Sequence, residues 1–175
     1  MIEITKEQYK NLDGMRFVSR AISKDELRPQ LTTINVTTWG AEATDGHRLH
    51  RLLLDHTWEP GLYRVIKNTK SLMVLIKDDT GMEYPNTDQI WPDETVLEFQ
   101  ELPSGNGDVN LLLKDVYRAL PANTTINYLY VLDVVGDYNW TYAPPTEDIY
   151  KPIVFRNGIE RAALIVAVED KRTRS

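Results

Sequence analysis

ATDGHRLHR, residues 43–51, is the stretch that decides the fold. Its centre, Asp45-Gly46, is a dipeptide suited to the positive φ angles of a tight hairpin turn. The residues on either side have the composition of strands, so the sequence predicts a β-hairpin around this turn. The same nine residues hold two histidines and two arginines, which raises the question of whether the hairpin carries a chemical site.

A metal site is one candidate for this cluster. His47, His50 and His56, with Asp45 and Asp55, have the composition of a ligand set, but zinc needs ligands that converge at about 2 Å from one point. Residues 47 and 50 of a strand point to opposite faces, because the side-chain period is two, and His56 lies beyond the strand. The pattern therefore favours polar residues around a hairpin over a three-histidine site.

Catalytic motifs are missing from the sequence. It contains no G-x-S-x-G stretch, no P-loop, and only a GNG at 105–107 that is too short for a dinucleotide loop. The acidic pairs at 78–79 and 147–148 are expected to be solvated loop residues. The absence of cysteine excludes disulfides, thiolate zinc sites and cysteine nucleophiles. We therefore expect no enzyme, with no catalytic residues, no metal and no cofactor.

The bulk composition is typical of a globular protein. The 175 residues, 26% charged and 42% hydrophobic, are enough for one domain with a proper core. The first residues do not form a signal peptide, and no apolar run of about 18 residues occurs, which predicts a cytoplasmic protein without membrane contact. The acidic residues are concentrated in residues 93–150, which contain 10 acidic and only 2 basic residues. A basic face elsewhere is therefore compatible with the net charge of −6.

The first half of the chain predicts a strand, a helix and further strands. Residues 2–5 form the first strand, and Thr5 with Gln8 has the pattern of a capping box. A helix is expected over residues 6–23, because Leu12, Met15 and Val18 recur at helical spacing. More strands are expected at 30–40, on both sides of Asp45-Gly46, at 61–68 and at 71–79, the last of which also fits a short helix.

The second half repeats this order after a connecting loop at residues 81–92. We expect a strand at 95–102, a helix at 109–120, and strands at 124–135, 139–143, 151–157 and 159–169. The predicted fold class is therefore α+β, one domain over residues 1–169. Its two β-α-β-β-β-type halves, at about 1–80 and 93–169, place two helices on one side of antiparallel sheets. Residues 170–175 are expected to form a charged tail.

Basic residues gather on one face of each predicted helix. Those of the first helix fall within an arc of roughly 120°, opposite its apolar face, although Asp13 interrupts them. A plain solvated face explains one such helix, whereas two helices side by side would offer salt-sensitive, sequence-independent contacts to phosphate. The candidate residues are Lys6, Lys10, Arg16, Arg20, Lys24, Lys114 and Arg118.

ATDGHRL (Ala43–Leu49) is very similar to a signature of the bacterial sliding clamp, the beta subunit of DNA polymerase III. YPNTDQIWP (Tyr84–Pro92) resembles the segment that leaves a clamp domain, and parts of Lys151–Val168 resemble the closing strands. The resemblance covers most of residues 1–169 and implies a sliding-clamp, or processivity-fold, domain. Family members have three such domains per chain, and two chains close a ring whose helices carry Lys and Arg toward the duplex. In this chain the resemblance gives that role to the basic residues named above.

The resemblance also implies a binding pocket at the turn. In the family this pocket lies between two domains and receives short peptides from polymerases and other partners. An apolar patch of this kind takes Leu or Phe anchors, while the turn backbone orients the peptide. Transferred by matching positions, the pocket residues are Thr44, Gly46, His47, Arg48, Leu49, Pro92, Leu164 and Val166.

These features predict a sliding clamp-like processivity or scaffold protein from a phage or mobile element. It would bind replication-protein peptides and could encircle duplex DNA as a homo-oligomer of about six copies. The alternative is a monomeric clamp mimic or adaptor that binds clamp-interacting peptides without encircling DNA. A hydrolase or metalloenzyme built on the histidine cluster comes third, and stoichiometric zinc in the purified protein would support it.

Overall fold

The chain forms two compact units. The computed structural model describes residues 1–102, 109–118, 120, 124–135, 140–144, 152–166 and 168–169. Unit 1 comprises Met1–Thr87 with Ile159–Arg161, and unit 2 comprises Asp88–Gly158 with Ala162–Ser175. The boundary after Thr87 falls inside the connecting loop expected at residues 81–92. That the two units together make one domain stays a prediction.

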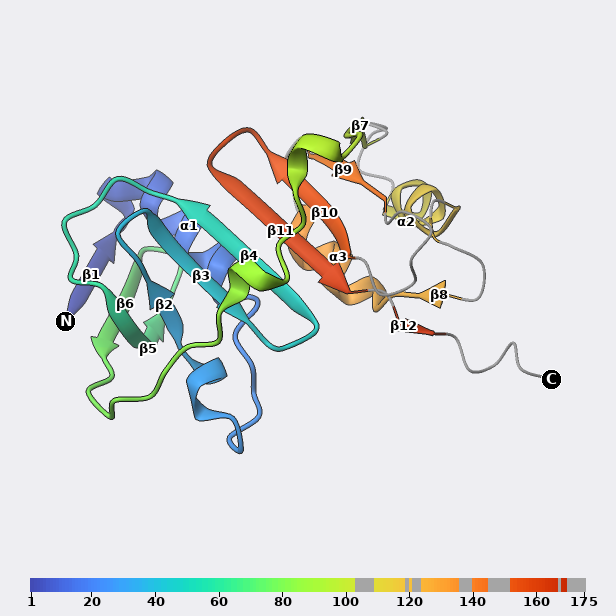
Figure 1. The fold of residues 1–175 in the computed structure, drawn as a ribbon. Helices are drawn as coiled ribbons and strands as arrows, with labels where there is room; N and C mark the ends of the chain where they lie inside the picture. Colours follow the sequence, from blue (N-terminus) through green and yellow to red (C-terminus); the bar gives the residue numbers. More distant parts are fainter. Residues whose placement is uncertain are drawn as a thin grey trace. The chain divides into compact units, whose positions relative to one another are not determined.

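Unit 1 is an antiparallel sheet with one α-helix packed on it (Figure 1). Its strands follow the order β1-β6-β5-β2-β3-β4. The strand expected at 71–79 is β6 and not a helix. The elements are β1 (Ile2–Thr5), η1 (Lys6–Gln8), α1 (Tyr9–Ser19), η2 (Pro29–Thr32), β2 (Ile34–Val36), β3 (Gly40–Thr44), β4 (Arg48–Leu53), β5 (Gly61–Asn68) and β6 (Leu72–Lys77).

The core of unit 1 lies between α1 and the sheet. The predicted apolar face of the helix is confirmed, because Leu12, Met15 and Val18 are buried. Gly14 permits the close packing of the helix on β4, since a Cβ atom there would lie 2.8 Å from both methyl carbons of Leu52. A residue of low helix propensity therefore stands where a larger one would force the Leu52 side chain to move.

The helix predicted over residues 6–23 is too long at both ends. Its first three residues form the 3₁₀ turn η1, and α1 ends at Ser19. In a continuing helix the Arg20 carbonyl would accept the backbone N–H four residues later. Here that carbonyl accepts a hydrogen bond from the Arg48 guanidinium. Lys24, which was grouped with the basic face of this helix, lies beyond its end.

Unit 2 contains shorter strands and two α-helices among its described residues. Its larger group of strands follows the order β11-β10-β9-β7, and β9 pairs antiparallel with both β10 and β7. Strand β12 pairs antiparallel with β8. The elements are η3 (Thr87–Gln89, from the last residue of unit 1), η4 (Glu94–Val96), β7 (Gln100–Glu101), α2 (Val109–Arg118), β8 (Thr124–Thr125), α3 (Tyr128–Val135), β9 (Thr141–Ala143), β10 (Pro152–Asn157), β11 (Arg161–Val166) and β12 (Val168–Glu169).

The strand expected over residues 124–135 is wrong, because most of it forms the helix α3. The side chain of Asn127 accepts the backbone N–H of Leu129 at 3.1 Å, which is a typical helix N-cap. Periodicity alone cannot assign such a short apolar run. The buried side chains of α3 recur at helical spacing: Val131, Val134 and Val135.

The strand expected over residues 95–102 is also wrong in its first part. Asp93 accepts the backbone N–H of Thr95 at 3.0 Å and starts the 3₁₀ turn η4, and within the expected strand only Gln100–Glu101 forms one, as β7. The α+β class with antiparallel strands is confirmed, with α3 as an additional helix. No helix in the described part of the chain is long and apolar enough to cross a membrane. The expected tail at 170–175 lies outside the described residues.

Candidate functional site

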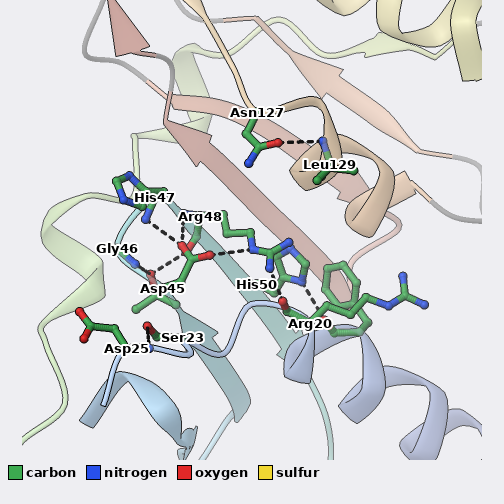
Figure 2. A network of polar contacts seen from close by, with 12 residues as sticks. Arg20, Ser23, Asp25, Asp45, Gly46, His47, Arg48, His50, Asn127 and Leu129 are labelled. Atoms are coloured by element: carbon green, nitrogen blue, oxygen red, sulfur yellow. Dashed lines mark hydrogen bonds and ion pairs between the residues drawn. The ribbon is translucent and has the colours of Figure 1, made fainter. Parts of the chain in front are cut away.

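The turn segment, Thr44–Arg48, joins β3 to β4 and is organised by Asp45 (Figure 2). One carboxylate oxygen, Oδ1, accepts the backbone N–H of His47 at 2.9 Å and that of Arg48 at 3.1 Å. The other, Oδ2, accepts Arg48 Nε at 3.1 Å. A single acidic side chain therefore satisfies the turn amides and orients the arginine.

Thr44 and Gly46 complete the turn. Thr44 Oγ1 donates to the Arg48 carbonyl at 2.6 Å and accepts the Gly46 N–H at 3.0 Å. Gly46 has a φ of 92°, a backbone conformation that favours glycine. A Cβ atom at this position would lie 3.0 Å from Nη1 of Arg28, so a guanidinium packs directly against the turn. The predicted hairpin turn is confirmed, and the side chains of Thr44, Asp45 and Arg28 hold its conformation.

Arg48 connects the turn segment to the end of α1. Its side chain is 9% exposed and that of Asp45 is 13% exposed, so the ion pair between them is nearly buried. The same guanidinium donates to the Arg20 carbonyl, as Figure 2 shows. A charge that leaves water needs both an opposite charge and further hydrogen bonds. The Arg48 guanidinium therefore makes both its ion pair and its hydrogen bond to a backbone carbonyl within unit 1.

His50 is a core residue of β4. Its ring stacks on Phe17 with 4.4 Å between centroids, and its Nδ1 lies 2.7 Å from the Phe17 carbonyl oxygen. Burial, opposed by this hydrogen bond and assisted by Arg48 and Arg20, lowers the pKa of His50 from 6.5 to about 3. The imidazole is therefore neutral near pH 7 and donates from Nδ1 to the carbonyl.

The other two histidines have different surroundings. His47 is exposed on the turn, and His56 accepts the Trp58 backbone N–H through Nδ1 at 3.1 Å while stacking on the Trp58 ring. Within the described residues, no group of three or more His, Cys, Asp or Glu side chains could hold a metal ion. The three histidines thus occupy separate settings.

The predicted pocket residues come from both units. Of the five in unit 1, Gly46 and His47 are exposed, whereas the other three are buried: Thr44, Arg48 and Leu49. Because Leu49 is fully buried, truncating it to alanine would cost about 2–5 kcal/mol of stability and would not probe binding cleanly. In unit 2, Pro92 and Val166 are partly exposed, and Leu164 is buried. Their assignment to a pocket stays a prediction.

A second polar network, not foreseen from the sequence, surrounds Glu42 on β3. Its carboxylate accepts Asn35 Nδ2 at 2.9 Å, Arg51 Nε at 3.0 Å and Thr87 Oγ1 at 2.7 Å. Arg51 also donates to Thr87 Oγ1 at 2.7 Å. The network fastens the last residue of unit 1 to the hairpin. The hairpin register, which places Glu42 opposite Arg51, is the signal that would have revealed the ion pair.

Tyr84 lies close to this network and to the turn. Burial and the neighbouring Glu42 carboxylate raise the pKa of the Tyr84 phenol. The phenol therefore stays neutral, and the segment that carries it is held against the hairpin by Thr87.

The predicted DNA-facing residues also divide between the units. In unit 1, Lys6, Lys10, Arg20 and Lys24 are exposed and Arg16 is partly exposed. In unit 2, Lys114 and Arg118 are exposed on α2, and Arg118 Nη1 lies 3.5 Å from Asp115, a surface pair of small energetic weight. Their role toward DNA stays a prediction.

The comparisons with known proteins identify the fold. No protein-family model and no curated protein sequence matches the chain. Solved bacterial sliding clamps do match, each over 96% of this chain and 65% of its own. The DNA polymerase III beta subunit of Bartonella birtlesii bound to griselimycin has a TM-score of 0.64 at 14% identity. That of Pseudomonas aeruginosa bound to griselimycin has 0.63 at 14%, and the Streptococcus pyogenes beta subunit 0.58 at 16%.

The chain therefore has the fold of the bacterial sliding clamp, as the resemblance of ATDGHRL implied. At these identities the likeness concerns the fold alone. The chain spans about two thirds of the length of the solved clamps that it matches.

The buried His50 predicts a specific dependence of stability on pH. Between pH 6.5 and about 3 the unfolded imidazole is protonated and the folded one is not, so stability falls as the pH is lowered through this window. Lowering the pH from about 7 to about 5 should therefore reduce the free energy of unfolding by about 2 kcal/mol through this residue.

Urea unfolding of the parent and of His50→Gln, which lacks the titrating ring, measures this contribution. The variant should lose about 2 kcal/mol less than the parent between about pH 7 and about pH 5. His47 and His56 are present in both proteins and cancel in the comparison. Equal losses in the two proteins would show that His50 is not held neutral by burial.

Proposed function

We propose that this chain is a sliding clamp-like scaffold that binds short peptides of replication proteins and the phosphate backbone of duplex DNA, without catalysing a reaction. The observation that carries the proposal is the clamp fold over 96% of the chain, with the ATDGHRL stretch forming an ordered turn within it. No cofactor and no metal enter this function.

The ordered turn supports peptide binding. Asp45, Thr44 and Arg48 fix the backbone around Gly46 and His47, the two exposed residues of the predicted pocket in unit 1. A preformed surface binds a peptide without the entropic cost of ordering a loop. Solved clamps of this fold bound to griselimycin support a ligand-binding role for the fold.

The extent of the match supports a particular domain correspondence. One domain of a three-domain clamp would account for about one third of that chain, whereas the match extends over 65%. We therefore propose that the two units correspond to parts of two neighbouring clamp domains. The interpretation as two halves of one domain is the alternative.

The exposed and partly exposed basic residues on and beside α1 and α2 support contact with DNA. Lysine and arginine side chains that project from a helix neutralise phosphates without reading the base sequence. The candidates are those named above: Lys6, Lys10, Arg16, Arg20, Lys24, Lys114 and Arg118. Binding of this kind weakens steeply as salt is raised, because counterions are released from the duplex.

A clamp mimic or adaptor is the second candidate function. It is favoured by one observation: the chain spans only about two thirds of the solved clamps that it matches. Such a protein would bind the same peptides but would neither encircle DNA nor retain it in a salt-sensitive way.

Replacing His47 tests the peptide site at the turn. His47→Ala removes an exposed ring without disturbing the buried pair of Asp45 and Arg48, so folding should persist. Affinity for a synthetic peptide with Leu and Phe anchors should fall about ten-fold, measured by fluorescence anisotropy on the full chain. His56→Ala is the matched control and should bind like the parent. Equal affinities for all three proteins would remove the turn from the binding site.

The mass in solution separates the two candidate functions. Light scattering over a wide concentration range, at low and moderate salt, should give a mass of about three chains if the two units supply two domains of a six-domain ring, or about six chains if they make one domain. A stable monomer or dimer would contradict ring closure by this protein alone and would favour the adaptor.

A further inference from the structure

We propose that Arg161 supports DNA binding by α1 and its flanking segments, because it neutralises Asp13 and so keeps that carboxylate from pairing with Lys10 or Arg16. The inference rests on the proposed DNA binding and adds a positioning residue to it. Arg161 is not among the residues expected to face DNA, and it is separated from Asp13 by 148 positions in the sequence.

Asp13 is the one acidic residue of α1, and it lies in the middle of the basic face. Lys10 and Arg16 precede and follow it by three positions, a spacing that brings side chains together on a helix. The sequence alone would therefore pair Asp13 with one of these two basic residues.

The structure pairs Asp13 with a different residue. Arg161 donates from Nη2 to Asp13 Oδ2 at 2.6 Å, and the two side chains are 9% and 20% exposed. Arg16 instead donates from Nε to Asn68 Oδ1 at 3.3 Å, and Lys10 is exposed. The carboxylate is thus neutralised from outside the helix.

Arg161 is held in place by its neighbours in unit 1. The guanidinium carbon lies 5.9 Å from the centre of the Phe17 ring, a distance compatible with a cation–π contact. The preceding residue is anchored as well, because the Glu160 carbonyl accepts the Leu53 backbone N–H at 2.7 Å. Ile159–Arg161 therefore belongs to unit 1, although it is distant in sequence.

Burial determines what Arg161 can do for a DNA ligand. As a whole residue it is 8% exposed, so it does not itself present a charge to solvent phosphates. Its effect acts through Asp13. Without the guanidinium, a carboxylate within the basic face would repel phosphates and would draw Lys10 or Arg16 into a local pair.

Binding of a short labelled duplex DNA by the full chain, followed by anisotropy over a salt series, tests this role. Arg161→Gln should weaken binding about five-fold at low salt, and the difference should shrink as salt screens the carboxylate. Asp13→Asn should bind at least as tightly as the parent. The double variant Asp13→Asn with Arg161→Gln should return to the parent affinity, because the repelling charge is gone.

Two further variants separate this electrostatic role from simple loss of structure. Arg161→Lys keeps the positive charge and should bind close to the parent. Arg64→Gln also leaves an acidic partner, Asp78, without its arginine, but on the sheet; it should have a smaller effect than Arg161→Gln.

Three outcomes would overturn the inference, and they are distinguishable. If the double variant stays as weak as Arg161→Gln, the arginine supports the fold and not the charge of the face. If Arg161→Gln and Arg64→Gln bind DNA equally well, Arg161 has no particular role in DNA binding. In both cases the proposed DNA binding stands. If the parent itself shows no salt-sensitive binding, the DNA part of the proposed function fails, and the inference fails with it.

Discussion

The ion pair between Asp45 and Arg48 is the interaction on which the rest of the turn depends. The carboxylate satisfies the backbone amides of the turn, and the guanidinium extends the same network to the Arg20 carbonyl at the end of α1. Because the pair is nearly buried, removing either partner would leave an uncompensated charge at a cost of about 3–5 kcal/mol. This contact therefore fixes the turn and ties it to the C-terminal end of α1.

The surface left for a ligand follows from this arrangement. Arg48 is used internally, Leu49 and His50 are in the core, and only Gly46 and His47 of the turn segment face solvent. Glu42, Arg51 and Thr87 fasten the neighbouring chain segment in a similar way. Most residues of the ATDGHRL stretch thus build and hold the turn, and few of them are free to contact a peptide.

What the sequence predicts well is local. An Asp-Gly dipeptide between strand-forming residues specifies the hairpin, and the spacing of Leu12, Met15 and Val18 specifies the buried face of α1. The contact of the Arg20 carbonyl with Arg48, 28 residues away, was not predictable from the local sequence. The contact of Asp13 with Arg161 has no local signal either. Helix α3 was missed because a short apolar run fits both a strand and a helix.

The most direct test of peptide binding at the turn is an amide NMR titration of the full chain with the Leu- and Phe-containing peptide. Binding at the turn predicts saturable shifts of the Gly46 and His47 amides, with the Asp45 hydrogen bonds retained. Saturable shifts confined to residues outside Thr44–Arg48, with the turn amides unmoved, would contradict it. The titration locates the contact itself, so it does not depend on the effect of any substitution.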